Sequence, residues 1–253
     1  MKMVISPAKS LQFDTQLPTS VQTEPLFGVE AQKINDLLKK KSPKELSKLM
    51  SISDKLAELN WERNQAFQMS ESKAASRAAI FTFNGDVYQG LDANSLDENK
   101  IEQMQGQLRI LSGLYGFLKP LDAIQPYRLE MGTALKVGSH KNLYSFWKDK
   151  ITNQLNAEMD SDELFINLAS NEYFSVIDAK SLVAKIVTPQ FKDFKNGKLK
   201  IISFFAKKAR GMMARHLIEN NASKMEDIIS FTSQGYSYSE EETTDVLSPV
   251  FIR

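Results

Sequence analysis

Charged and polar side chains in this sequence repeatedly follow short apolar runs that predict β-strands. The members of this set are Ser6, Lys9, Asp86, Tyr88, Arg128, Glu130, Asn171, Glu172, Lys207, Lys208 and Arg210. In open α/β sheets, ligands bind outside the carboxyl ends of the strands. If several of these strand ends share one edge of a sheet, the sequence predicts a polar cleft lined by charges of both signs. For each segment taken singly, the alternative is a turn that carries solvated charges.

Three cations of this set indicate an anionic partner. Lys207, Lys208 and Arg210 stand where a helix is expected to begin, and the helix dipole makes cations unfavourable at that end. An anion such as a phosphate, bound at the helix N-terminus, would make their placement favourable. The alternative is a charged helix that is simply solvated.

The carboxylates of the set suit a ligand site or an enzyme. Asp86, Glu130 and Glu172, each beside Lys or Arg, could do acid–base work or hold a divalent metal that bridges a phosphate. They could equally form ion pairs that hold the loops together. The candidate ligand cleft consists of Ser6, Asp86, Tyr88, Glu130, Asn171 and Glu172.

A second candidate site is the segment Leu49–Ala57, which joins two expected helices through a tight connection of small residues. This pattern is similar to the helix-hairpin-helix motif, in which backbone N–H groups and a helix N-terminus hold a DNA phosphate. Lys55 would lie beside that phosphate, with Arg63 two turns further along. Ser51 and Ser53 replace the usual glycines, and Ser enters positive φ less readily. The alternative is an ordinary helix pair capped by Ser53.

Residue content excludes several common catalytic centres. The sequence contains 0 Cys, which removes disulfides, thiol peroxidase chemistry and thiolate metal sites. Of its 2 His, neither belongs to the Glu-x-x-His pair of a ferritin-like site. There is no P-loop, no G-x-G-x-x-G and no G-x-S-x-G motif. Residue content and motifs therefore assign no catalytic residue, no metal site and no cofactor, whereas a metal site made of oxygen ligands alone stays an open alternative.

Apolar periodicity and turn signals interleave strands and helices along the chain. Strands are expected at Met1–Ser6, Ala78–Phe83, Leu108–Leu111, Leu164–Ala169, Lys185–Val187, Phe191–Phe194, Leu199–Phe205 and Val250–Arg253. Helices are expected at Val29–Lys40, after the capping boxes at Ser42 and Ser95, and at Asp54–Phe67, Leu143–Met159 and Ala206–Asn220. This order predicts an α/β fold with a mixed sheet. Residues 1–253 should form a single compact body, with the helix-hairpin-helix-like element at about 43–68.

The charge balance gives no global signature of a nucleic-acid binder. Lys+Arg is 32 and Asp+Glu is 31, so any such role depends on uneven placement of charge. The N-terminus MKMVISPAKS lacks the apolar run of a signal peptide, and no apolar run is long enough to span a bilayer. We expect a cytoplasmic protein with no membrane partner.

A series of segments that spans nearly the whole chain carries a family resemblance. They are ISPAKSLQFD, LMSISDKLAELN, FNGDVYQGL, LRILSGLYGFLKPLDAIQPYRLEMG, LYSFWKDKI, INLASNEYF and KNGKLKIISFFAKKARGMMARHLIEN. In this order they resemble the YaaA family of bacterial peroxide-stress proteins. The resemblance implies resistance to hydrogen peroxide through lower free intracellular iron, and a compact α/β body with a positively charged cleft. It also implies a helix-hairpin-helix element that binds DNA.

Applied to this chain, the resemblance assigns DNA contacts to Ser51, Ser53, Lys55, Arg63, Lys9, Arg128, Lys207, Lys208 and Arg210. We predict a non-enzymatic protein of the peroxide stress response that binds double-stranded DNA with little sequence preference. The alternative is an enzyme or a small anionic-ligand binder that uses the polar cleft. A continuous basic groove as wide as a duplex favours DNA, whereas a small closed pocket lined by both signs favours a ligand. No feature of the sequence identifies a protein partner.

Overall fold

The computed structural model describes residues 1–69 and 76–253, with a five-stranded sheet of order β6-β5-β1-β8-β9 at its centre. The strands are β1 (Lys2–Ile5), β5 (Leu108–Ser112), β6 (Gly116–Leu118), β8 (Leu164–Leu168) and β9 (Lys185–Val187). All are parallel except β6, which pairs antiparallel with β5. Met3 of the central strand pairs with Leu108 on one side and Ile166 on the other. The nearly continuous apolar runs of these strands are typical of a parallel sheet buried on both faces.

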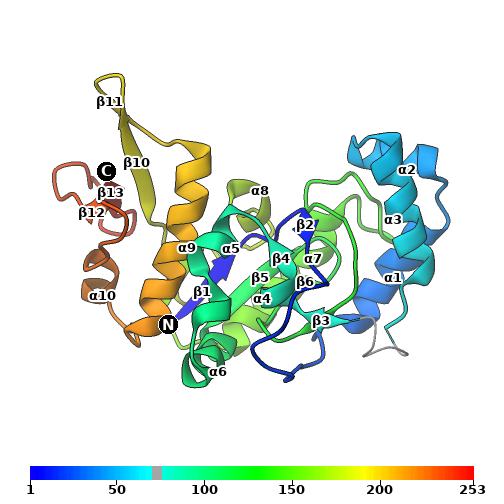
Figure 1. The fold of residues 1–253 in the computed structure, drawn as a ribbon, viewed down its shortest axis with the longest axis horizontal. Coiled ribbons are helices and arrows are strands. Elements are labelled where there is room, and N and C mark those ends of the chain that lie inside the picture. Colours follow the sequence, from blue (N-terminus) through cyan, green and yellow to red (C-terminus); the bar gives the residue numbers. More distant parts are fainter. Residues whose placement is uncertain (70–75) are drawn as a thin grey trace.

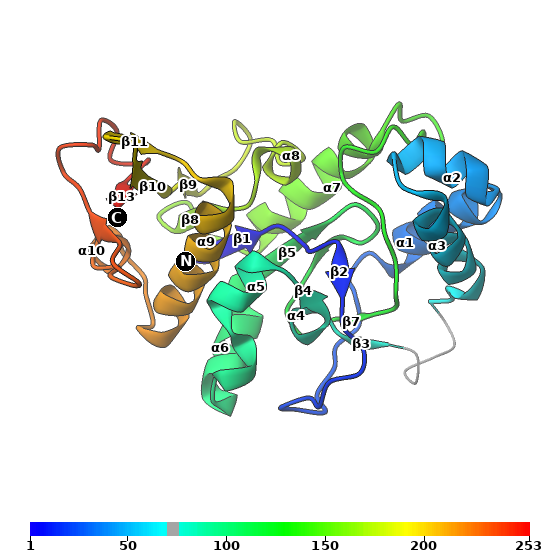
Figure 2. The same cartoon turned by 45° about the horizontal axis from the view of Figure 1, so that its top comes forward.

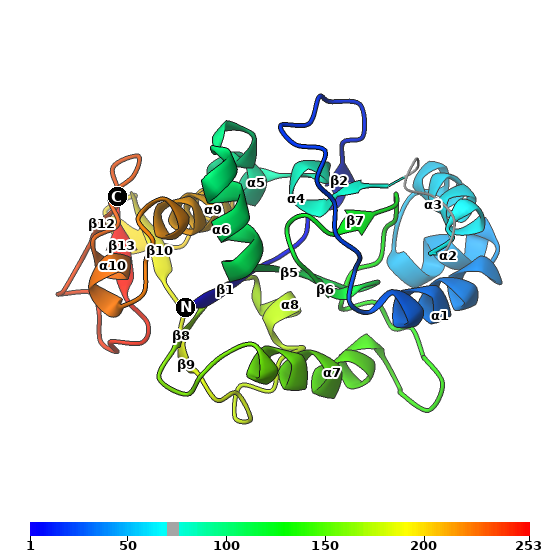
Figure 3. The ribbon, with the colours of Figure 1, turned by 90° about the horizontal axis from the view of Figure 1, so that it is seen from below.

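Helices cover both faces of this sheet (Figure 3). On one face lie α5 (Asp86–Leu91), α6 (Glu98–Gln107) and α9 (Ser203–Glu219). On the other face lie α7 (Leu143–Ala157) and α8 (Asn171–Phe174). Trp147 of α7 is fully buried and donates a hydrogen bond of 2.9 Å to the carbonyl oxygen of Gly113. The predicted α/β class with a mixed sheet is confirmed.

Two smaller assemblies stand at opposite ends of the central sheet (Figures 1 and 2). One end consists of α1 (Gly28–Lys39), α2 (Pro43–Met50) and α3 (Asp54–Ala66). The other end has a sheet of order β11-β10-β13-β12 with α10 (Met225–Ile229) beside it. Its strands are β10 (Gln190–Lys195), β11 (Lys198–Lys200), β12 (Ser237–Tyr238) and β13 (Val250–Ile252). No helix in the described ranges is long and apolar enough to span a membrane.

The connection between α2 and α3 is as tight as the sequence predicts. Ser51 adopts the left-handed conformation, with φ 51 and ψ 51. That conformation is supported by Ser47, whose carbonyl oxygen accepts from the Ile52 N–H at 3.1 Å and whose hydroxyl donates to the Ile52 carbonyl oxygen at 2.7 Å. Ser53 has extended backbone, and its hydroxyl caps α3 by accepting from the Leu56 N–H. Only one of the two serines needs a positive φ, so the turn closes without glycine. That this helix pair binds DNA stays a prediction.

Two of the predicted strands are wrong. Most of the predicted strand 78–83 is a one-turn helix, α4 (Ala79–Thr82), between the two-residue strands β3 (Arg77–Ala78) and β4 (Phe83–Asn84). These strands pair with β7 (Ala123–Ile124) and β2 (Ser10–Leu11) respectively. Because every residue of α4 is buried, its sequence has no helical periodicity to distinguish it from a buried strand.

The second wrong strand is 199–205, where β11 ends at Lys200 and α9 begins at Ser203. The aromatic pair Phe204 and Phe205 favours a strand by composition, yet both side chains are exposed on the first turn of the helix. Elsewhere in this hairpin the prediction is confirmed, because Asn196 and Gly197 both take positive φ between β10 and β11. The capping box at Ser95 is also wrong: Asp97 caps α6 by accepting from the Lys100 N–H at 2.9 Å.

Candidate functional site

A cavity of about 510 Å³ lies at the carboxyl ends of β1 and β8. Its lining includes Ser6 to Ser10, which follow β1, and Ser170, Glu172 and Tyr173, which follow β8. The chain leaves β1 toward β5 and leaves β8 toward β9, on opposite sides. Such a topological switch point is where open α/β sheets bind their ligands.

Hydrogen bonds between the two strand ends fix the base of this cavity. The Ser170 N–H donates to the Ser6 hydroxyl at 2.9 Å, and the two hydroxyl oxygens lie 3.2 Å apart. The Tyr88 hydroxyl donates to the Ser6 carbonyl oxygen at 3.1 Å. Burial, reinforced by the nearby Tyr127 and Tyr173, raises the pKa of Tyr88 well above its ordinary value. Tyr88 therefore acts as a neutral hydrogen-bond donor.

Helices α5 and α9 bring charges of both signs to the cavity because glycines let them cross in direct backbone contact. A Cβ atom on Gly90 of α5 would lie 2.1 Å from the Lys208 carbonyl oxygen. A Cβ on Gly211 of α9 would lie 1.9 Å from the Val87 carbonyl oxygen. Only glycine permits so close an approach. As a result, Asp86 from α5 and Arg210 from α9 line the same cavity.

Three of the charged groups in the cavity have no partner among the residues that the structure describes. Throughout the described part of the chain, Asp86, Lys207 and Arg210 form no side-chain hydrogen bond or ion pair. Arg210 is half-buried, and its burial lowers the pKa of the guanidinium. Opposite charges thus line one cavity without neutralising each other, which leaves them available to a ligand.

Next to the cavity, Glu130 is surrounded by an excess of cations. A small hollow lined by Arg128 and Glu130 shares Pro7, Ala8, Lys9 and Tyr173 with the cavity. One Glu130 carboxylate oxygen accepts from Lys9 Nζ at 3.1 Å and from Arg128 Nη2 at 2.9 Å. Burial, together with repulsion from Arg128, lowers the pKa of Arg63 on α3, so a third cation is close by. Arg128 Nε is buried without a hydrogen-bond partner among the described residues.

The three predicted carboxylates therefore differ in role. Glu130 forms two ion pairs, and the Glu172 carboxylate accepts from the Gly132 N–H at 3.1 Å. These three contacts connect loops, and the two of Glu130 are the ion pairs that the alternative expects. Asp86 holds none, so it is the carboxylate of the set that is free for a ligand within the described ranges.

The structure separates the remaining predicted residues into three places. The cavity is lined by Ser6, Lys9, Asp86, Tyr88, Glu172, Lys207 and Arg210. Lys208 and Asn171 line neither the cavity nor the adjoining hollow. Ser51, Ser53 and Lys55 are exposed at the α2–α3 turn, away from the cavity.

Several contributors were not singled out from the sequence. Ser170, Tyr173 and Asn84 line the cavity, and all three follow apolar runs, so the strand-end signal covers them. Gly90 and Gly211 gave no signal, because an isolated glycine in a helix does not reveal what it packs against. The β10–β11 hairpin also exposes Lys195, Lys198 and Lys200 on one face, and on its other face Phe194, which is 66% exposed. The sequence signal for that surface is the run KDFKNGKLK.

These features define a doubly wound α/β protein with a mixed-charge cavity at its switch point. The chain belongs to the family described as peroxide stress protein YaaA, whose model matches residues 1–242. A UPF0246 protein of Flavobacterium johnsoniae is 58% identical over 238 residues, covering 94% of each chain. One of Aliivibrio fischeri is 52% identical and covers 96% of this chain and 95% of its own. One of Shewanella piezotolerans is 48% identical and covers 100% of this chain and 99% of its own.

Proposed function

We propose that this peroxide-stress family member is a cytoplasmic protein that binds double-stranded DNA through its phosphates, with little sequence preference. The observation that carries the proposal is the α2–α3 turn, which exposes Ser51, Ser53 and Lys55 at the start of the 13-residue helix α3. The first N–H groups of a helix have no intrahelical acceptor and attract anions. The Asp54 carboxylate lies 3.3 Å from the Ser47 hydroxyl of α2, whose proton is donated mainly to the Ile52 carbonyl oxygen at 2.7 Å.

The placement of the other cations supports the same function. Although the net charge is only +1, Lys9 and Arg128 both pair with the carboxylate of Glu130, and Arg63 lies close enough to Arg128 to be repelled by it. The β10–β11 hairpin lies toward the end of the molecule opposite α3 (Figures 1 and 2). It exposes Lys195, Lys198 and Lys200, and α9 exposes Lys207. Exposed cations in both places suit a polyanion.

A gel-shift titration with unrelated duplexes at two salt concentrations tests this function. Phosphate contacts release counterions, so the logarithm of the binding constant should fall with the logarithm of salt, with a slope of about −0.9 per phosphate neutralised. Strong preference for one duplex, or an affinity that is indifferent to salt, would count against the proposal.

Lys55→Glu is the sharpest variant, because it replaces an attraction with a repulsion at an exposed first-turn position. An acidic residue is favourable at a helix N-terminus, so the free energy of unfolding should change by no more than about 0.5 kcal/mol. Duplex affinity should fall for all sequences alike. Lys55→Ala should lower the magnitude of the salt slope by about one.

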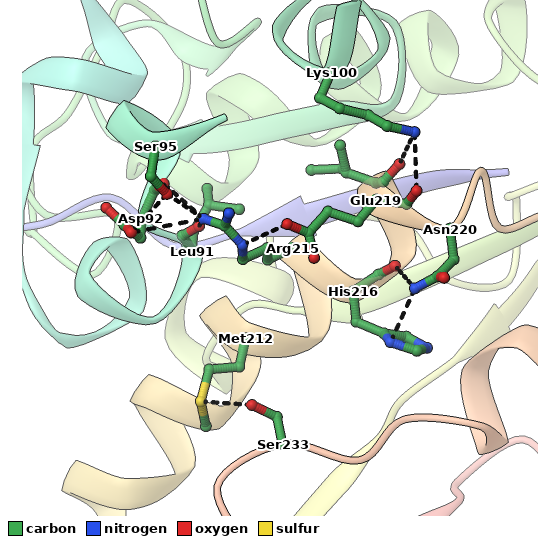
Figure 4. Close-up of polar contacts among 11 residues, drawn as sticks. Leu91, Asp92, Ser95, Lys100, Met212, Arg215, His216, Glu219, Asn220 and Ser233 are labelled. Atoms are coloured by element: carbon green, nitrogen blue, oxygen red, sulfur yellow. Dashed lines mark hydrogen bonds and ion pairs between the residues drawn. The ribbon is translucent and has the colours of Figure 1, made fainter. Parts of the chain in front are cut away.

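Lys44→Glu is the matched control for Lys55→Glu. Lys44 occupies the second position of α2 as Lys55 does in α3, and both are exposed. Lys100 would be a poor control, because its ammonium donates to the Ile218 and Glu219 carbonyl oxygens at the end of α9 (Figure 4). The proposed role of the turn fails if the folded Lys55→Glu variant binds duplexes as well as Lys44→Glu does.

The proposal includes a lower level of free intracellular iron during peroxide stress, which the family resemblance implies. Electron paramagnetic resonance of chelated iron in whole cells measures this level. Cells that lack the protein should hold more free iron after peroxide exposure, and the wild-type chain should restore the lower level. Equal iron in the two strains would contradict this part of the proposal.

A further inference from the structure

Two arginines five residues apart on α9 have opposite surroundings. Arg215 Nη1 donates to the Leu91 and Asp92 carbonyl oxygens at 3.1 and 2.8 Å and to the Ser95 hydroxyl at 2.8 Å. Its Nε donates to Glu219 at 2.8 Å, so its guanidinium is well satisfied (Figure 4). Arg210 is half-buried and has no partner anywhere in the ranges that the structure describes. A half-buried charge without a partner destabilises the fold, so its position indicates a ligand.

The cavity that Arg210 lines is built for a molecule larger than a simple ion. Its volume of about 510 Å³ falls within the roughly 300–1,000 Å³ typical of small-molecule sites. Its lining includes the apolar residues Pro7, Val87 and Leu168 and the hydroxyl-bearing residues Ser6 and Ser170. Lys207 lies one helical turn before Arg210 on the same side of α9, so the two cations can hold one anionic group together.

The negative charge of Asp86 in the same cavity restricts which class of ligand fits. Asp86 lines the cavity without a partner among the described residues, and an ionised carboxylate only accepts hydrogen bonds. A complementary ligand therefore carries an anionic group at one end and hydroxyl or amino donors at the other. Arginine forks bind phosphate oxygens, and acidic residues at switch points bind sugar hydroxyls.

We propose that this cavity binds the sugar-phosphate unit of a nucleotide. The phosphate contacts Arg210 and Lys207, and the sugar hydroxyls or base amino groups donate to Asp86. This site is separate from the α2–α3 turn, so it does not depend on duplex binding there. The nucleotide is either free in solution or an unpaired nucleotide of a DNA strand. An internal deoxynucleotide has no free sugar hydroxyl, so in a DNA strand the group that donates to Asp86 is a base amino group.

Isothermal titration calorimetry in phosphate-free buffer tests the site with adenosine 5′-monophosphate, ribose 5-phosphate and inorganic phosphate. Both organic phosphates should bind, and inorganic phosphate should bind about tenfold more weakly, because it makes no contact with Asp86. Arg210→Gln and Asp86→Asn should each weaken the organic phosphates by about tenfold or more. Lys44→Gln, outside the cavity, should leave their affinity unchanged. Absence of binding at millimolar concentration, or equal binding by Arg210→Gln, would overturn the proposal.

Thermal unfolding separates a ligand-binding Arg210 from a structural one. Without ligand, Arg210→Gln should melt at or above the temperature of the wild type, because the substitution removes an unpartnered half-buried charge. A clearly lower melting temperature of that variant would show that Arg210 holds the fold instead, and the proposal would fail.

A third experiment tests whether the nucleotide is free or part of a DNA strand. It also tests whether the cavity and the α2–α3 turn bind independently. Lys55→Glu should bind adenosine 5′-monophosphate as the wild type does, whatever the outcome for duplex DNA. In that variant, competition by a short single-stranded oligodeoxynucleotide indicates a nucleotide of a DNA strand, and lack of competition indicates a free nucleotide. Loss of nucleotide binding in Lys55→Glu would contradict a separate cavity site.

Discussion

Glu130, in the loop before α7, connects Lys9 to Arg128, because its carboxylate forms ion pairs with both. Removing one partner of a partly buried ion pair leaves the other charge unsatisfied. Glu130→Gln should therefore lower the free energy of unfolding by about 1–3 kcal/mol. The same change frees two cations and should tighten duplex binding. Urea unfolding and gel-shift titration measure the two effects.

Glu240→Gln is the control for this pair of effects, because Glu240 is exposed and its carboxylate has no partner in the described ranges. It changes the net charge by the same amount and should alter neither stability nor duplex affinity appreciably. If Glu130→Gln and Glu240→Gln change stability and duplex affinity equally, Glu130 does not hold Lys9 and Arg128 together.

At the residue scale, the sequence predicts which side chains follow strands but not which of them are paired. Ser6 follows the observed strand β1, whereas Asp86 and Arg210 follow the predicted strands 78–83 and 199–205, which are partly helical in the structure, yet all three line one cavity. Whether Asp86 contacts a cation depends on how α5 and α9 cross. Local sequence patterns do not show how two helices cross. Helical periodicity does contain one further distinction: Lys207 and Arg210 are three residues apart and share a side, whereas Lys208 points elsewhere.

At the scale of elements, the crossing of α5 and α9 decides the geometry of the cavity. Gly211→Ala would place a Cβ 1.9 Å from the Val87 carbonyl oxygen, so the two helices must separate. We expect the free energy of unfolding to fall by about 3 kcal/mol or more, and nucleotide binding to weaken because Asp86 moves away from Arg210. Chemical denaturation and calorimetry provide the measurements.

Gly106→Ala in α6 is the opposite case on the same face of the sheet. A Cβ at Gly106 meets nothing within 4 Å, so alanine should stabilise this helix by about 1 kcal/mol through its helix propensity. A Gly211→Ala variant that is also stabilised would show that the helix crossing tolerates a side chain.

Element types were predictable where a pattern has only one interpretation. The Asn196-Gly197 hairpin and the capping box at Ser42 are local chemistry, and the structure confirms both. The α4 helix was not predictable, because a segment buried on every side shows neither helical nor strand periodicity. Ser51 shows a third case, in which a serine takes a positive φ because Ser47 supplies two hydrogen bonds to the turn.

At the scale of the whole molecule, the interleaved order of elements predicts the α/β class but not the order of strands. The central strand β1 pairs with β5 and β8, which follow it by more than a hundred residues. Such long-range pairing leaves no local trace in the sequence, yet it creates the switch point between β1 and β8. The position of the candidate site is therefore set by the order of the strands. The residue types that line the site are visible in the sequence.

The residue content of the whole chain predicts that the protein does not itself turn over peroxide. A chain with 0 Cys and 2 His lacks the thiolate and the Glu-x-x-His ligands of common peroxide- and iron-oxidising centres. Both histidines have other roles: the His140 ring packs edge-on against Phe146, and His216 Nε2 lies 3.0 Å from the Asp227 carbonyl oxygen. Purified protein should therefore show no catalase, peroxidase or ferroxidase turnover in a steady-state peroxide assay with added iron. Turnover that survives repurification in the presence of a chelator would contradict this prediction, and would place the protein's contribution to peroxide resistance in chemistry rather than in binding.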